Sequence, residues 1–253
     1  MSKLIIFFFL LSLPSWSAEQ NPYLISGFDD VLRQAENTGL IKAALKIFEN
    51  DKTFAGMAEL YQVLTRSESG LEKFILVSAI SNVFDARIDK LLSESHYPTH
   101  KRYLRSWLTE WSIENFKISK IKKIIDDHPD RKFMVIFDNS QASIRMARTF
   151  QEKFSDKIVN IYLRKVVAQD PMPGVVLFTN AFEIALNEYK QGRLSPEDLA
   201  NVGNSLLSEK IKENIFPSYA LCPKEKSMCL DAPERVRQIC HTVEEHLQKI
   251  CLN

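Results

Sequence analysis

Apolar and polar positions follow two periods along this chain. Four near-continuous apolar runs, rich in β-branched and aromatic residues, cover residues 23–28, 73–80, 132–139 and 157–166. Such runs are typical of strands buried on both faces of a parallel sheet. Amphipathic helical patterns lie between them, at residues 56–66, 82–94, 118–128 and 141–154. Strand and helix in alternation predict an α/β fold, a parallel sheet flanked by helices with right-handed crossovers.

The last third of the chain is predicted to be helical. Beyond Pro173 the strand pattern stops, and one helix is expected over residues 195–207. Ser195 is placed to cap its N-terminus, and Pro196 stands at the first helical position. The final residues, 232–251, have the pattern of a last amphipathic helix.

The N-terminus has the order of a signal peptide. Residues 2–17 place one Lys before about ten apolar residues and then small residues, which is the order of such peptides. The run is too short to span a membrane. We expect cleavage after Ser17, with an uncleaved N-terminal anchor as the alternative. An exported domain, periplasmic or secreted, is therefore expected, with no transmembrane segment once the signal is removed.

These patterns predict that the chain is divided into three parts. The signal peptide covers residues 1–17, the α/β domain residues 18–170, and a helical C-terminal extension residues 171–253. Within the α/β domain, the segment that contains Trp107 and Trp111 matches neither the strand nor the helix pattern. The formal net charge is +1 and no long basic run is present. Nucleic acid is therefore not an expected partner.

The cysteines are confined to the C-terminal extension. All four lie in the last 32 residues: Cys222, Cys229, Cys240 and Cys251. An even, clustered set in an oxidising compartment predicts two disulfides, and the spacing lacks the paired CxxC of a zinc site. Cys240 and Cys251 lie roughly 16 Å apart on one helix face, so they cannot pair with each other. An antiparallel approach would pair Cys229 with Cys240 and Cys222 with Cys251, but the crossed pairing stays open.

Polar side chains gather where the predicted strands end. In a parallel sheet this edge is the usual place for a ligand. The polar residues there are Asp29 and Asp30 after the first strand, Ser78 after the second, and Asp138 with Asn139 after the third, while Lys117 precedes the predicted helix that leads into the third strand. Acid, hydroxyl, lysine and acid are the groups that phosphoryl transfer through an aspartyl-phosphate needs, the last acid helping to hold magnesium.

The sequences of the strand ends and of the helices between them, and their order along the chain, resemble those of one protein family. "SGFDDV" resembles that family's "SDIDDT", and "FILVSAISN" its "YVSSSPW". "FKISKIKKIIDDHPDRKFMVIFDNSQAS" is similar to "HKLEAIRRILEDFPDRKFILIGDSGQKD", and "KIVNIYLRKV" to "RIAAIYIRDV". The chain thus resembles, over residues 23–167, the catalytic domain of the actin-patch-type phosphatidate phosphatases, a branch of the haloacid dehalogenase superfamily. The resemblance implies a Rossmannoid fold and a magnesium-dependent phosphomonoester hydrolase.

The resemblance also assigns roles to individual residues. It places Asp29 on the general acid/base, Asp30 on the acid after it, and Ser78 and Lys117 on the two phosphate-binding positions. It further places Asp138, together with the carbonyl of Asp29, on the magnesium. Asp29 and Asp30 have a plainer alternative, because Asp often caps a turn after a strand, and the alternative for Lys117 is an ordinary solvated lysine at the entry of a helix, in a lysine-rich run.

Three positions depart from the family pattern. Gly27 falls on the nucleophile, and a glycine has no side chain to attack phosphorus. Phe137 replaces a glycine, and Ser143 replaces a second acid near the metal. With two carboxylates lost, Asp138 and the carbonyl of Asp29 make a poor magnesium site.

Two classes of function follow. The first is a catalytically impaired relative that keeps at most the binding of a phosphorylated small molecule, a phospholipid head group or a protein partner of unknown kind, and needs no cofactor. The alternative is an active magnesium-dependent phosphohydrolase on phosphatidate or another phosphomonoester, using water activated by Asp29.

Overall fold

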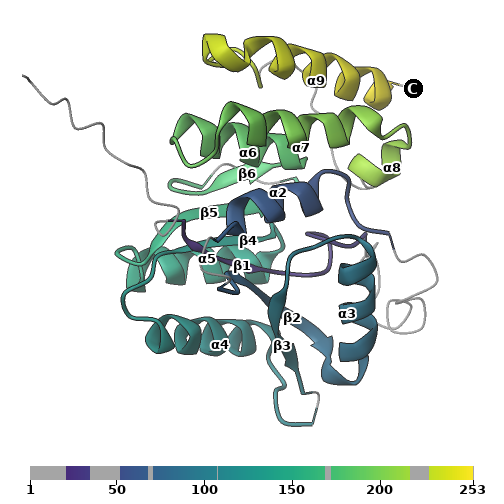
Figure 1. Cartoon of the computed structure of the whole chain (residues 1–253). Coiled ribbons are helices and arrows are strands. Elements are labelled where there is room, and N and C mark those ends of the chain that lie inside the picture. The colour runs from purple at the N-terminus through teal and green to yellow at the C-terminus, as the bar shows by residue number, and fades with distance from the viewer. Residues whose placement is uncertain are drawn as a thin grey trace, which may run out of the picture.

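The computed structural model describes residues 21–34, 52–67, 71–106, 108–168, 172–216 and 228–252. Within these residues the chain forms one six-stranded sheet flanked by helices (Figure 1). The strands are β1 (Tyr23–Ser26), β2 (Phe74–Ser81), β3 (His100–Arg105), β4 (Phe133–Asp138), β5 (Ile158–Arg164) and β6 (Val176–Phe178). Their order is β3-β2-β1-β4-β5-β6, and every pairing is parallel. The predicted α/β fold with a parallel sheet is confirmed.

The two edge strands were not predicted. β3 has the sequence HKRYLR, and its residues are exposed or half-buried, as charged edge strands often are. Arg102 of β3 donates from Nε to Asp85 Oδ1 at 2.6 Å, which ties the edge strand to the helix that precedes it. β6 has three residues and pairs with β5. The expectation that no strand follows Pro173 is therefore wrong at β6.

Helices cover both faces of the sheet. α4 (Ile113–Asp127) and α5 (Gln141–Lys153) lie on one face. The other face carries α2 (Met57–Thr65), α3 (Asp85–Glu94) after the short 3₁₀ turn η2 (Asn82–Phe84), and α6 (Ala181–Lys190). α7 (Pro196–Ser208) packs on α6 and α2, and α9 (Glu234–Leu252) lies outermost on α7, with the short α8 (Lys212–Ile215) beside them (Figure 1).

The sheet divides the interior into two apolar clusters. Along β4, Met134 and Ile136 face the cluster shared with α2 and α6, whereas Val135 and Phe137 face the cluster shared with α4 and α5. This alternation follows from the two-residue period of a strand. Phe137, one residue before the end of β4, therefore lies on the side of α4.

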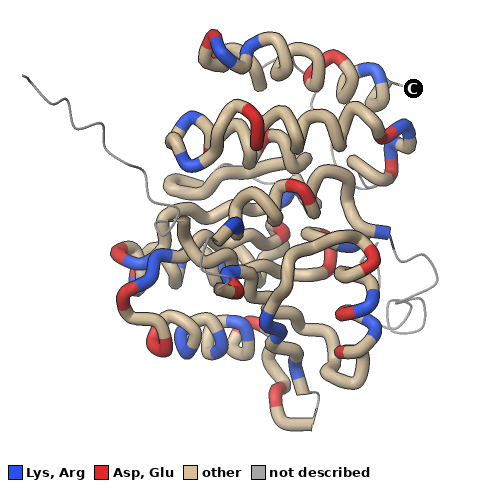
Figure 2. Tube along the Cα trace, viewed as in Figure 1, with Lys and Arg blue, Asp and Glu red and all other residues tan. Residues whose placement is uncertain are grey.

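The helix predicted over residues 195–207 is present as α7, and its N-terminus is capped as the sequence predicts. Ser195 Oγ accepts the N–H of Asp198, and the Asp198 side chain accepts the N–H of Ser195, with Pro196 at the first position of α7. Figure 2 shows Lys and Arg interspersed with Asp and Glu over most elements. Among the described residues, no helix is both long and apolar enough to cross a bilayer.

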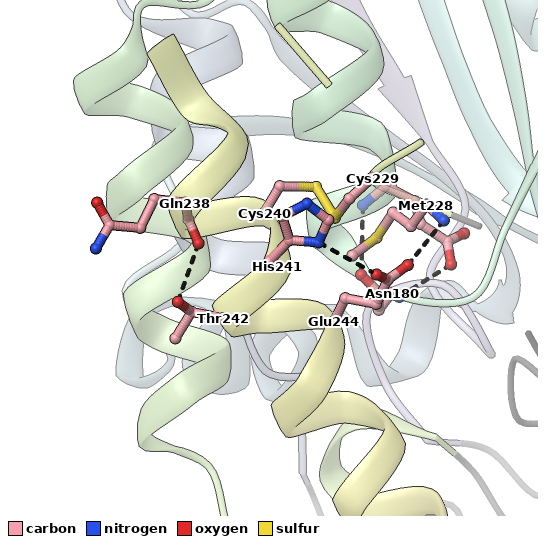
Figure 3. The surroundings of a disulfide bond; sticks show 9 residues. Asn180, Met228, Cys229, Gln238, Cys240, His241, Thr242 and Glu244 are labelled. Carbon is pink, nitrogen blue, oxygen red and sulfur yellow. Dashed lines mark hydrogen bonds and ion pairs between the residues drawn. A yellow bond between two sulfur atoms is a disulfide. The ribbon is translucent and has the colours of Figure 1, made fainter. Parts of the chain in front are cut away.

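One disulfide joins α9 to the segment before it. Cys229 and Cys240 are bonded with an S–S distance of 2.07 Å, and both are buried (Figure 3). This bond confirms the predicted pairing and excludes the crossed one. Cys251 is also disulfide-bonded. Its predicted partner, Cys222, lies outside the described residues.

Candidate functional site at the carboxyl ends of β1 and β4

Gly27 follows β1 directly and meets Phe137, the residue before the last one of β4. Its N–H donates to the carbonyl of Ile136 at 2.9 Å, so Gly27 continues the pairing of β1 with β4. A Cβ at residue 27 would lie 2.9 Å from Cδ1 of Phe137 and 3.4 Å from Cγ2 of Val31. Carbon atoms do not pack at 2.9 Å without displacing one another. The buried ring of Phe137 therefore fills the space into which a side chain at residue 27 would project.

Lys117 meets the same ring from α4. Its Nζ lies 5.0 Å from the centroid of the Phe137 ring, within the range of a cation–π contact. The structure thus brings together two residues that the resemblance places in the catalytic site, Gly27 and Lys117, and inserts Phe137 in contact with both. The sequence identified Phe137 as a departure but gave no sign of this contact.

Asp29 is engaged within its own turn. Its Oδ1 accepts hydrogen bonds from Arg33 Nε at 3.1 Å and Nη2 at 2.5 Å. The Arg33 side chain is buried, and its guanidinium carbon lies 5.3 Å from the centroid of the Phe28 ring. A partly buried carboxylate with two charge-assisted hydrogen bonds is held firmly. The predicted acid/base therefore has a structural partner that sequence reasoning missed, although the four-residue spacing was visible.

Asp30 shapes the same turn. Its φ is +57°, a left-handed conformation that Asp tolerates better than most residues. Its N–H donates to the carbonyl of Arg33 at 2.8 Å, and the residue is buried. Asp29 and Asp30 together hold the turn after β1, which is the plainer alternative that the sequence left open for them.

Asp138 ends β4 and caps the turn into α5. Its Oδ1 accepts the N–H of Ser140 at 2.7 Å and the hydroxyl of Ser143 at 3.2 Å. Ser143 is buried, and it stands where the resemblance places a second metal-binding acid. The Ser143 hydroxyl donates to Asp138. The two positions to which the resemblance assigns metal-binding acids are therefore joined by a hydrogen bond between their side chains.

Ser78 lies in β2, the strand on the other side of β1. It is buried, and its Oγ accepts the N–H of Ile80 at 3.2 Å. The pairing of β2 with β3 shifts register between Ser78 and Ser81. This local bend gives Ser78 a backbone role as a turn-forming hydroxyl.

Two buried residues fix the surroundings of the site: Asn139, which the sequence placed at this edge without a role, and Arg164, which it did not single out. Asn139 accepts from the N–H groups of Val166 and Val167 through Oδ1, at 2.7 and 3.0 Å, which joins the end of β4 to the loop after β5. Arg164, 1% exposed, donates to the carbonyls of Val31 at 3.2 Å and Thr179 at 2.9 Å. A basic residue at the end of an apolar strand was the available signal for Arg164, since an Arg is rarely buried without a structural or functional task.

The magnesium positions do not fit a metal as they stand. One oxygen of Asp138 is taken by Ser140 and Ser143, and the resemblance asks of Asp29 only its backbone carbonyl, so Asp138 is the single carboxylate expected at the metal. Where the resemblance places the nucleophilic carboxylate, the structure has an aromatic ring, which supplies no ligand for a hard cation.

One other group of potential ligands appears in the described residues. It consists of Cys229, His241 and Glu244, whose ligand atoms lie within 4.8 Å of one another (Figure 3). The sulfur of Cys229 belongs to the disulfide, so it is not the thiolate that binds metals. Glu244 Oε1 instead accepts the N–H of Met228 at 2.9 Å.

The fold is that of an α/β protein with an open parallel sheet. Its candidate site lies at the carboxyl ends of β1 and β4, where the order of the strands reverses, and this is the usual ligand position in such sheets. The family model described as phosphatidate phosphatase APP1, catalytic domain, matches residues 23–165, and the chain belongs to this family. The resemblance seen in the sequence is thereby confirmed. No curated protein and no solved structure matches the chain. The family match ends before β6, so α6 to α9 lie outside it.

Proposed function

We propose that this protein is an exported, catalytically inactive member of the phosphatidate phosphatase family that acts by binding. One observation carries the proposal: the ring of Phe137 fills the space above Gly27 and contacts Lys117. A nucleophile at residue 27 and a ring at residue 137 exclude each other sterically.

The loss of the nucleophile removes the covalent route. An aspartyl-phosphate intermediate divides a difficult hydrolysis into two easier steps, and a glycine cannot form it. Positioning and charge stabilisation are all that remain. Here these are weakened as well, because Asp29 is paired with Arg33 and Asp138 with the start of α5.

Binding of a phosphate group is compatible with the same geometry. An ammonium in a cation–π contact keeps its charge and its N–H donors, and Lys117 is half-buried rather than enclosed. The carboxyl edge of the sheet thus offers a cation beside a rigid turn. A phosphorylated small molecule or phospholipid head group is the ligand class that this supports, bound without turnover.

Export is supported by two features from opposite ends of the chain. Residues 2–17 have the order of a signal peptide. The Cys229–Cys240 bond is of the kind that persists in oxidising compartments and is rare in the cytosol.

The test is phosphate release with magnesium, from phosphatidate and from a generic phosphomonoester. The wild type should show no appreciable turnover. Gly27→Asp alone should also be inactive, because the added carboxylate meets the Phe137 ring. The variant with Gly27→Asp, Phe137→Gly and Ser143→Asp has the nucleophile, the space and the second acid, and should be the more active of the two. Wild-type turnover above about 1 s⁻¹, in the usual enzyme range and lost in Asp29→Asn, would overturn the proposal.

Calorimetry tests the metal separately. Magnesium is strongly hydrated and needs carboxylate ligands, so the wild type should show no site tighter than about millimolar. Tight binding that is abolished by Asp138→Asn would show that Asp138 holds a metal in spite of its hydrogen bonds to Ser140 and Ser143.

A further inference from the structure

Four side chains that can bind a metal meet where α9 packs on the turn before it (Figure 3). Cys229, His241 and Glu244 each place one ligand atom within 4.8 Å of the other two. Cys240 is bonded to Cys229 and brings a second sulfur to the same place. Two thiolates, an imidazole and a carboxylate are all ligands that zinc binds in tetrahedral sites. With free thiols, the group around the disulfide would therefore have the composition of a zinc site.

The helix and the turn present these ligands together. Cys240 and Glu244 are four residues apart on α9, and His241 and Glu244 are three apart, so the three side chains lie within about one helical turn of one another. Cys229 approaches from the turn that precedes α9. A spacing without paired CxxC gives no sign of this group, because it is assembled by tertiary packing.

Glu244 is oriented as a metal ligand commonly is. Its Oε1 accepts the N–H of Met228 at 2.9 Å, which ties the carboxylate to the residue before Cys229. Its Oε2 lies 3.7 Å from Nδ1 of His241. Hydrogen bonds of this kind from the surrounding protein fix the orientation of a ligand. The Glu244 side chain is only 8% exposed, whereas that of His241 is 53% exposed, so an ion has access from the side of His241.

The distances need little adjustment. Two sulfurs bonded to one zinc lie about 3.8 Å apart, given zinc–sulfur bonds of about 2.3 Å in a tetrahedron. Once the bond between Cys229 and Cys240 is broken, rotation of either side chain about its Cα–Cβ bond can provide this separation. The folded positions of α9 and the turn are compatible with both the disulfide and the metal.

We propose that Cys229, Cys240, His241 and Glu244 bind zinc when the Cys229–Cys240 disulfide is reduced. A dithiol transfers two electrons and two protons to the disulfide and becomes a disulfide itself. Zinc then binds the two thiolates and releases their protons. The metal would thus replace the covalent link that joins α9 to the preceding turn. The same thiols exist in the newly made chain before the disulfide forms, and the site is independent of the phosphate-binding edge of the sheet.

The experiment is a zinc titration of the purified protein in competition with a chromophoric chelator, before and after reduction with a phosphine. The oxidised protein should not compete. The reduced protein should bind one zinc per chain with a Kd below about 1 μM, as structural zinc sites do. Cobalt in place of zinc should give the intense visible absorption of a tetrahedral thiolate complex.

The cysteines provide a matched pair of variants. Cys229→Ser with Cys240→Ser should abolish binding, whereas Cys222→Ser with Cys251→Ser should leave it unchanged. Failure of the reduced wild type to bind zinc, equal binding by the oxidised protein, or binding that is lost with Cys222 and Cys251 would each overturn the proposal.

The other two ligands are tested in variants that keep the disulfide, so that their folding can be verified by urea unfolding before reduction. Glu244→Gln retains an acceptor for the N–H of Met228 but loses the charge, and it should weaken zinc binding tenfold or more after reduction. His241→Ala should do the same. The controls are the exposed neighbour in Glu245→Gln and the other histidine of α9 in His246→Ala, both of which should bind as the wild type does. An equal loss in these controls, or no loss in Glu244→Gln and His241→Ala, would contradict the proposed ligands.

Discussion

The contact between Gly27 and Phe137 predicts an unusual stability effect. Gly27→Ala adds a single methyl group at a residue whose φ lies outside the left-handed region. At such a position the change normally stabilises a protein by about 0.4–1 kcal/mol, because the unfolded chain loses freedom. Here the methyl carbon would lie 2.9 Å from Phe137 Cδ1, in a core where overpacking costs about 1–3 kcal/mol. The net expectation is a loss of about 1–2 kcal/mol.

Removing the ring should reverse the sign. Phe137→Ala alone is expected to cost about 3–5 kcal/mol, because the ring is 1% exposed and leaves a cavity. In that background Gly27→Ala meets no ring and should regain its stabilisation of about 0.4–1 kcal/mol. The two changes are therefore coupled by about 2 kcal/mol, well outside the ~0.3–0.5 kcal/mol within which independent sites add.

Urea unfolding of the four proteins, with the disulfides intact, measures this coupling. The m-values should agree across the set, so that the midpoints report stability alone. A second cycle with Phe150→Ala in place of Phe137→Ala serves as the control, because Phe150 is equally buried in the same cluster but is not among the atoms nearest to residue 27. Additivity in the Phe137 cycle would refute the contact, and with it the steric reason for the proposed loss of activity.

Two further predictions concern the C-terminal extension. Replacing Cys229 and Cys240 together with Ala should lower the free energy of unfolding by about 3 kcal/mol, the chain-entropy value for a loop of 11 residues, as measured by urea unfolding. Burial raises the pKa of Asp198, but the hydrogen bonds from Ser195 and the charge of Arg66 outweigh it and leave the pKa below its ordinary value of 3.8. The stability from Asp198 should therefore be full above pH 3.8 and be lost as the pH falls below it, and Asp198→Ala should reduce this dependence in unfolding curves at pH 7 and pH 3.

The buried strands could be predicted from the sequence, and the edge strands could not. β1, β2, β4 and β5 are apolar on both faces, so the pattern of residues alone predicted them. β3 is polar because it lies at the edge, where Arg102 reaches Asp85 and Asp89 of α3. Its partners are set by tertiary packing, which a local pattern does not contain.

The candidate site likewise contains features that the sequence predicted and one that it did not. The resemblance assigned Gly27, Lys117 and Asp138 to the site, because short sequence motifs and their order along the chain are sufficient to align these positions with the family. It did not reveal that Phe137 covers Gly27, because this contact depends on the register of β1 with β4 and on the face to which residue 137 points. The loss of a nucleophile and the gain of a ring looked like two separate changes in the sequence, and in the structure they are one packing arrangement.

The sheet also separates two sets of packing constraints within one chain. Phe137 belongs to the cluster under α4 and α5, whereas Cys240 belongs to the cluster above the sheet with α2, α6 and α7. Side chains on opposite sides of a sheet share few neighbours, so substitutions in one cluster place little demand on the other. Substitutions at the contact between Gly27 and Phe137 should therefore leave the packing around the Cys229–Cys240 disulfide unchanged, and substitutions around the disulfide should leave that contact unchanged.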